Sequence, residues 1–138
     1  MSQPFIFIST FRLKQGKLEA FKEMCQGLVE FVGSNEPRVI AFNLYASADG
    51  TEVSNVQVHP DADSMVSHMQ LLREHISGAG SEESAIDVTT SNQIYGAPSD
   101  AVLEMIEGFD PGVPLPIKPV PLAGFTRSAA GEAQSAPG

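Results

Sequence analysis

The 138-residue sequence contains few basic residues, a single cysteine and no tryptophan. Eight Lys and Arg against seventeen Asp and Glu give a formal net charge of -9. The chain therefore lacks the clustered positive charge with which proteins bind phosphate backbones or anionic membrane surfaces. We expect neither nucleic acid nor a membrane among its partners. Cys25 alone can form no internal disulfide and no cysteine-rich zinc site.

Long apolar runs are missing as well. No stretch approaches the roughly 20 apolar residues that span a bilayer, and the N-terminal MSQPFIFISTF lacks the basic leader of a secretory signal. Apolar residues make up 42% of the sequence and charged residues 18%, which is ordinary for a globular domain with its own core. We therefore expect a cytoplasmic protein.

The first half of the sequence predicts three strands and one helix. Residues 5–11 alternate as a strand whose two faces are both apolar, and residues 17–35 repeat apolar side chains at helical spacing. This helix should end in a left-handed cap at Gly33 to Asn35. Residues 38–46 and 52–58 predict two further strands, joined at Asp49-Gly50. That dipeptide indicates a tight hairpin whose two central positions both need positive φ.

The second half predicts a helix, a strand and an extension. Asp61 or Asp63 can cap an amphipathic helix with the stripe Met65, Met69, Leu72 and Ile76. Residues 85–95 predict a fourth strand, with Ile86, Val88 and Ile94 on one face. A short helix from Ser99 or Asp100 to Ile106 and a proline-rich segment follow, and prolines there allow an edge strand or an extended arm. We divide the chain into a domain at 1–96, an extension at 97–127 and a disordered tail at 128–138.

The order β-α-β-β-α-β with a central hairpin predicts an α+β, ferredoxin-like fold. In that fold a four-stranded antiparallel sheet carries its helices on one face. The strands here are apolar on both faces, so the second face needs a cover. A second copy of the same sheet is the simplest cover, and we expect a homodimer.

From Pro4 to Tyr95 the sequence resembles the dimeric α/β-barrel superfamily, and within it the antibiotic biosynthesis monooxygenase (ABM)-like domains. The resemblance rests on the first strand FIFISTF, the Lys/Glu-rich helix after Gly16, the Asp49-Gly50 hairpin and the passage VQVHPDADSMVSHM. It implies a monooxygenase that needs no cofactor and acts on aromatic or quinone-like metabolites. His68 occupies the position of a histidine in the family's helix. Haem-degrading members use a tryptophan, so its absence argues against that branch.

His68 is the residue that we expect to be catalytic. It lies at the edge of an apolar stripe, where an imidazole is either a hydrogen-bonded structural group or a general base in a pocket between sheet and helices. The substrate-binding candidates are Asn43 and Tyr45 as orienting donors, His59 at the pocket mouth, and Met65 and Leu72 as apolar lining. His75, also at the stripe edge, fits a surface residue better.

No metal site is expected. His59, Asp61 and Asp63 do not converge at a helix start, and His68 and His75 are seven residues apart, unlike the i, i+4 pair of a zinc-binding helix. Two functions stay open. The first is a small cofactor-independent monooxygenase or related enzyme that acts on a small hydrophobic metabolite. The second is a non-catalytic dimeric ligand-binding or interaction protein whose proline-rich arm crosses to the partner.

Overall fold

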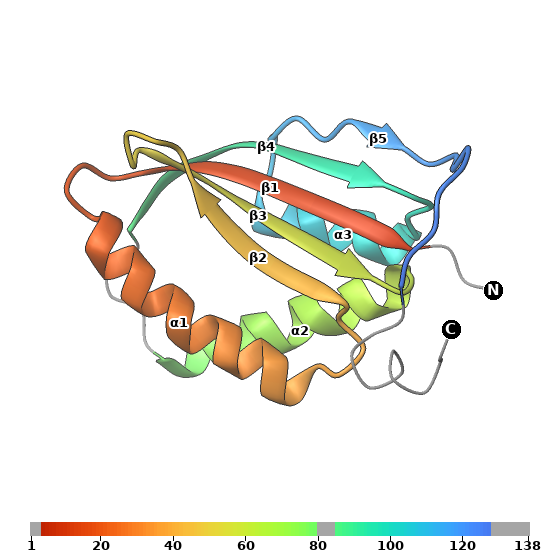
Figure 1. The fold of residues 1–138 in the computed structure, drawn as a ribbon, viewed down its shortest axis with the longest axis horizontal. Helices are drawn as coiled ribbons and strands as arrows, with labels where there is room; N and C mark the ends of the chain where they lie inside the picture. The colour runs from red at the N-terminus through yellow and green to blue at the C-terminus, as the bar shows by residue number, and fades with distance from the viewer. Residues whose placement is uncertain (1–3, 80–84, 128–138) are drawn as a thin grey trace.

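A computed structural model describes residues 4–79 and 85–127, and the expected tail at 128–138 lies outside these residues. The order of the elements is the predicted one (Figure 1). They are β1 (Phe5–Leu13), α1 (Leu18–Asn35), β2 (Ala41–Ala46), β3 (Glu52–His59), α2 (Ala62–Ala79), β4 (Ile86–Tyr95), α3 (Asp100–Phe109) and β5 (Ile117–Lys118). In the described ranges, no helix is both long enough and apolar enough to cross a membrane.

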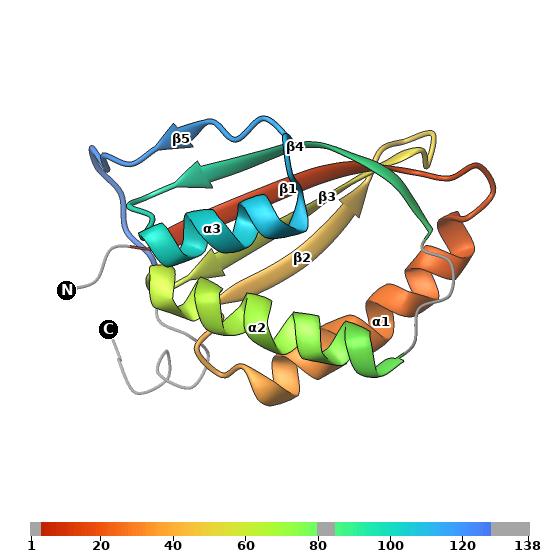
Figure 2. The ribbon, with the colours of Figure 1, turned by 180° about the vertical axis from the view of Figure 1, so that it is seen from behind.

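The strands form one sheet in the order β2-β3-β1-β4-β5. The first four are antiparallel to their neighbours, and β5 runs parallel to β4. All three helices cover the same face, as the two opposite views show (Figures 1 and 2). We call this face the inner face and the opposite one the outer face. The ferredoxin-like arrangement predicted from the sequence is thereby confirmed, with one strand more than expected.

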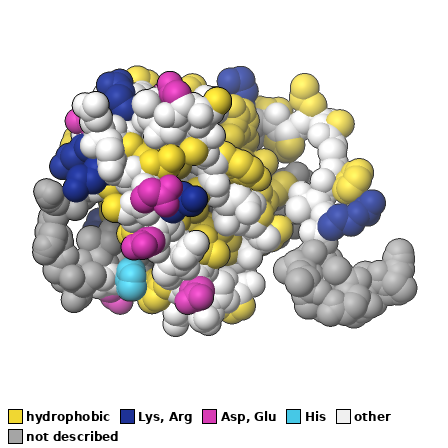
Figure 3. Space-filling view, turned by 60° about the vertical axis from the view of Figure 1, so that its left-hand side comes forward, with side chains coloured by type: hydrophobic (Ala, Val, Ile, Leu, Met, Phe, Trp, Pro, Cys, Tyr) yellow, Lys and Arg dark blue, Asp and Glu magenta, His cyan; other side chains and the backbone are white. Residues whose placement is uncertain are grey.

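The added strand comes from the proline-rich segment after α3. Pro114, Pro116 and Lys118 accept backbone hydrogen bonds from the N–H groups of Asn92, Ile94 and Gly96 on β4. Proline has no N–H to donate but keeps its carbonyl, so such a segment can pair along an edge by accepting. Beyond β5 the chain extends away from the rest of the protein (Figure 3, right). Its exposed apolar side chains are Val120, Leu122 and Phe125.

The hairpin between β2 and β3 lies where predicted, but its turn differs. Gly50 has φ 74°, whereas no described residue other than glycine has positive φ, so Asp49 does not. The Gly50 N–H donates to the Ser47 carbonyl, and the Asp49 carboxylate accepts from the backbone and hydroxyl of Thr51. A longer loop stabilised by the aspartate side chain therefore replaces the expected two-residue turn.

The predicted common face of β4 is wrong for one residue. Ile94 is fully buried opposite Phe7, whereas Val88 lies opposite Arg12 and is 44% exposed. The register with β1 shifts between Thr10 and Phe11 and again between Arg12 and Leu13. Each shift inserts an extra residue into β4 and inverts the alternation beyond it.

Helix α1 ends at Asn35 as predicted, but without a left-handed cap. Gly33 stays helical, and the capping residue is Glu36, with φ -130° and its N–H donating to the Val32 carbonyl. Pro37 disfavours helical geometry for the residue before it, so the chain turns at Glu36. The predicted second strand also begins later, at Ala41 instead of Arg38. The turn positions Glu36 against α2.

Two hydrophobic clusters fill the space between the sheet and the helices. One joins Phe5, Phe7 and Ile94 to α2 and α3, and the other joins Phe11 and Val53 to α1. Between the two clusters, polar residues of three adjacent strands lie in register across the inner face. We call this set the polar row: Asn55 of β3, Ser9 of β1 and Asn92 of β4.

Candidate active site

His68 points from α2 into the interior and is 1% exposed. The helix begins after Asp61, whose carboxylate accepts the Ser64 N–H at 2.9 Å, as expected for a capping aspartate. His68 lies one turn after Ser64. The centre of its ring is 5.4 Å from the centre of the Phe42 ring of β2 and 5.8 Å from that of the His59 ring of β3. His68 therefore sits over the β2–β3 half of the sheet.

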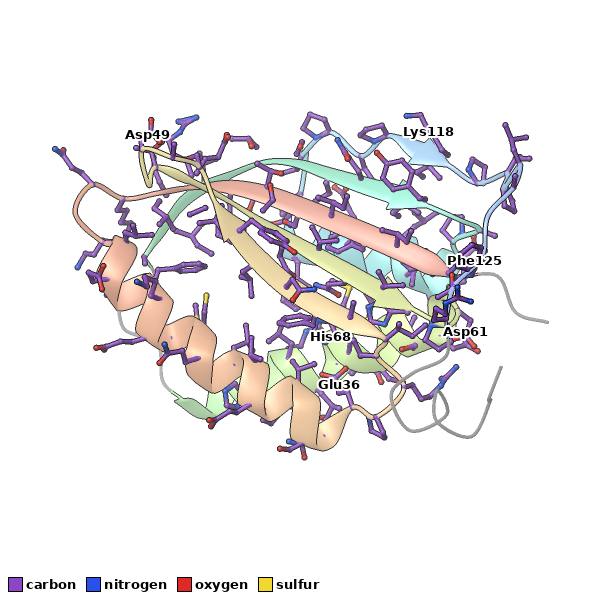
Figure 4. The ribbon with its side chains drawn as sticks, in the orientation of Figure 1. Glu36, Asp49, Asp61, His68, Lys118 and Phe125 are labelled. Carbon is purple, nitrogen blue, oxygen red and sulfur yellow. The ribbon has the colours of Figure 1, made fainter. Side chains whose placement is uncertain are left out.

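Glu36 holds the His68 ring. The Nδ1 atom of His68 lies 3.0 Å from each carboxylate oxygen of Glu36, which is 7% exposed. In Figure 4 the two side chains meet beneath the sheet, one from the end of α1 and the other from α2. Since a carboxylate only accepts, Nδ1 carries the proton and donates it to this bond.

The other ring nitrogen, Nε2, has no hydrogen-bond partner within the described part of the chain, and it is fully buried. With Nδ1–H bonded to Glu36, neutral His68 presents the Nε2 lone pair to its surroundings. An unsatisfied buried acceptor costs about 1–3 kcal/mol. A ligand that donates a hydrogen bond to Nε2 removes this cost on binding.

His59 is also buried, but all of its polar atoms are bonded. The Ser64 hydroxyl donates to Nδ1 at 2.8 Å, and Nε2–H donates to the Gln57 Oε1 atom at 3.0 Å. The Gln57 amide donates to Asn55, which in turn donates to the Asn43 carbonyl. All four bonds point in the same direction along β3, and this fixes one tautomer of His59.

Burial lowers the pKa of His59 to about 3, and its neighbour His68 acts in the same direction, while Asp61 opposes. The order Ser64–His59–Gln57 has the connectivity of a hydrolytic triad. However, Gln57 has no charge with which to stabilise an imidazolium, and His59 stays neutral at physiological pH. Ser64, His59 and Gln57 therefore form a structural network, and His68 packs against its histidine.

The structure brings some of the predicted site residues together and separates others. Met65, which is 1% exposed, lies one turn before His68 and packs against Phe5 and Phe7, and Leu72 is half-buried on the same helix. Asn43 and Tyr45 are exposed, and Tyr45 pairs with Ser54 on the outer face. The orienting donors proposed from the sequence thus lie across the sheet from His68.

His75 and Cys25 lie outside this site and have structural contacts of their own. His75 is exposed, and its ring stacks on Phe31 of α1 with ring centres 4.1 Å apart. Cys25 packs against the cluster around Phe11 and Phe21, and burial raises the pKa of its thiol. Neither residue contacts the His68–Glu36 pair.

Sequence reasoning missed Glu36 as a site residue. One signal was present in the sequence: a negative side chain at a helix C-terminus is repelled by the negative end of the helix dipole. Such a residue needs a compensating partner, and the partner here is His68, 32 positions further along the chain. Asn92 was equally hidden, since alternation alone could not tell which face of a two-sided apolar sheet is buried.

The comparisons with solved structures concern the fold. MupZ from Pseudomonas fluorescens superposes with a TM-score of 0.67 at 18% identity, covering 91% of each chain. A candidate antibiotic biosynthesis monooxygenase from Chloroflexus aurantiacus J-10-fl gives 0.55 at 13% identity, covering 90% of this chain and 98% of that one. A conserved protein from Methanosarcina mazei Go1 gives 0.52 at 17% identity, covering 67% and 90%. No family model and no curated protein matches the sequence.

Proposed function

We propose that this chain, which has the fold of the ABM-like proteins, is a small cofactor-independent monooxygenase. Its substrate would be a hydrophobic aromatic or quinone-like metabolite held between the sheet and the helices. One observation supports the proposal above the rest: His68 is buried, oriented by Glu36, and has a free acceptor at Nε2. A ring nitrogen that is free and held in place in this way can act as a general base towards an aromatic hydroxyl.

The proposed reaction needs no electron donor besides the substrate. Nε2 of His68 takes the hydroxyl proton, which raises the electron density of the ring and lets it reduce O2. In the enol form of such a substrate, this proton is one of the two hydrogens of a ring CH2. One oxygen atom of O2 enters the product as the new carbonyl, and the other leaves as water with the remaining CH2 hydrogen and the proton held by His68. Glu36 stabilises the imidazolium that forms, because its carboxylate already accepts from Nδ1. His68 then returns its proton to the departing oxygen.

We further propose that two copies pack through their outer faces. Apolar side chains of three strands lie there, only partly buried, while the helices cover the inner face. They are Ile6 and Ile8 of β1, Val56 and Val58 of β3, and Tyr45 of β2, the last being 61% exposed. Antiparallel sheets in water carry polar residues on an uncovered face, so these residues favour a partner sheet.

The test of the catalytic proposal is oxygen uptake with 1,8-dihydroxyanthrone, followed alongside the appearance of the anthraquinone. We expect His68→Ala to abolish enzyme-dependent uptake while lowering the melting temperature by no more than a few degrees. His75→Ala, the same change on the same helix, should leave uptake unchanged. Retained turnover in His68→Ala, or loss of its folding, would contradict the role of His68 as base.

A second candidate function is non-catalytic ligand binding on the same scaffold. The observation that favours it is the tight enclosure of His68 by Phe42, His59 and Glu36, as expected for a structural histidine. The same assay separates the two functions. A binding protein would take up the anthrone, seen by a change in its absorbance spectrum, without consuming oxygen above the background rate.

A further inference from the structure

Asn92 presents a second unpartnered acceptor in the interior. It lies on β4 and is fully buried. Its side-chain amide donates to the Asp110 carboxylate at 3.0 Å, and its backbone N–H donates to the Pro114 carbonyl. Because a carboxylate only accepts, the amide orientation is set, and the Oδ1 atom is the free end. Among the described residues, Oδ1 has no hydrogen-bond partner.

Asn92 and His68 lie over opposite halves of the same inner face. Asn92 is the β4 member of the polar row, opposite Ser9 of β1, which is opposite Asn55 of β3. His68 sits over the β2–β3 half, next to Phe42 and His59. Two strand spacings, about 10 Å, separate β3, against which His68 packs, from β4, which carries Asn92.

We propose that Asn92 is a second ligand-binding residue, whose Oδ1 accepts a hydrogen bond from the end of the ligand remote from His68. This proposal rests on the proposed function, because it assumes that the ligand lies between the sheet and the helices. The two free atoms are both acceptors. The ligand must therefore donate at both ends, and a rigid two- or three-ring aromatic diol has the required donors and length.

Two acceptors also make the site selective for one oxidation state. A dihydroxy aromatic donates to both His68 and Asn92. The corresponding dione presents carbonyl oxygens to two buried lone pairs, and leaves both acceptors unsatisfied. The site thus holds a diol more tightly than the corresponding dione.

The side chains between the two acceptors can adapt to a flat ligand. Met65 and Met69 lie one turn apart on α2 and pack in the cluster that also contains Phe7 and Ile94. Methionine is unbranched and flexible, and its sulfur contacts aromatic rings favourably. The ligand that we propose would displace these two side chains on its way from His68 towards β4.

The test compares two probes in two proteins by titration calorimetry. The probes are 2,6-dihydroxynaphthalene, with two donors, and 2-naphthol, with one. We expect Asn92→Leu, which removes the acceptor at similar volume, to weaken diol binding about tenfold, as for one hydrogen bond. Binding of 2-naphthol should change less than twofold. Gln70→Leu, an equivalent change at an exposed position of α2, should affect neither probe.

A second measurement uses the unaltered protein and covers the case in which Asn92→Leu does not fold. In ¹⁵N spectra, 2,6-dihydroxynaphthalene should shift the side-chain amide signal of Asn92, whereas 2,6-dimethoxynaphthalene, which has no donor, should not. Equal losses for both probes in Asn92→Leu, equal shifts for diol and diether, or binding of neither naphthol would each overturn the proposal. Selective diol binding without oxygen uptake would instead overturn only the monooxygenase.

Discussion

His59 and His68 lie 5.8 Å apart, yet their neighbours give them different roles. His59 is bonded at both nitrogens by neutral groups, Ser64 and Gln57. His68 is bonded at one nitrogen by a carboxylate and free at the other. Neutral partners at both nitrogens leave His59 no free atom for a ligand, whereas the free, oriented nitrogen of His68 can meet one. This contrast is the reason why we propose His68, and not His59, as the functional member of the pair.

The buried His59 predicts a loss of stability in acid. Its pKa is lowered from 6.5 to about 3 on folding. Between these values the unfolded chain binds a proton that the folded chain does not, so the free energy of unfolding falls as the pH drops from 6.5 towards 3. The slope from this residue is at most about 1.4 kcal/mol per pH unit.

Urea unfolding at several pH values checks this prediction. The comparison is between the natural protein and His59→Asn, which cannot titrate. The variant should be less stable at pH 8, since it loses bonds to Ser64 and Gln57, but should lose less stability on acidification. If the free energies of unfolding of the two proteins fell in parallel between pH 6.5 and 4, His59 would not stay neutral in the folded state.

At the scale of elements, helix ends position the site. The turn after α1 brings Glu36 to His68, and Asp61 starts α2 in the phase that points His68 inwards. Asp61 also pairs with Arg38, which lies two residues after Glu36. The segment between α1 and β2 is thus tied to α2 at two points. Exposed ion pairs such as that of Arg38 with Asp61 contribute little on their own.

Helix α3 gives a test of capping in this fold. Ser99 has extended backbone geometry and accepts the Val102 N–H at 3.2 Å. We expect Ser99→Ala to lower the free energy of unfolding by about 1 kcal/mol, because one N-terminal N–H loses its acceptor. Ser67→Ala, at an exposed position within α2, should instead be neutral or slightly stabilising, since Ala favours helix. Urea unfolding of both variants measures the difference, and equal effects would contradict a capping role for Ser99.

At the scale of the whole molecule, the sheet separates two environments. The inner face holds the catalytic candidate and the polar row beneath three helices. The outer face carries Asn43, Tyr45 and partly exposed apolar side chains. The homodimer that we propose would cover the outer face and leave the inner site intact. Asn43 and Tyr45 would then contact the partner chain and not the substrate.

Mass measurement by light scattering tests this interface. Ile8→Arg places a charge in the middle of the outer face, so we expect a monomer at micromolar concentrations, while the natural protein is a dimer. Met24→Arg, on the exposed side of α1, where Met24 is 49% exposed, should remain dimeric. A monomeric natural protein would rule out the interface, and so would two variants that dissociate equally.

The sequence by itself determined the order of elements and the place of the hairpin, and it limited the cap of α2 to Asp61 or Asp63, of which the structure uses Asp61. These features depend on periodicity, turn residues and caps within a few positions, so a local pattern is sufficient. The expectation that His68 lies inside also follows from its place beside the stripe of Met65 and Met69, and the structure buries all three.

Only the tertiary structure decided which groups meet. Glu36 and His68 are 32 positions apart, and the polar row joins β3, β1 and β4 through pairings between segments far apart in the sequence. Likewise, the burial of Asn55 and Gln57 and the exposure of Asn43 and Tyr45 follow from which face the helices cover. Successive side chains of a strand point to opposite faces of the sheet, but long-range packing determines which face becomes the interior.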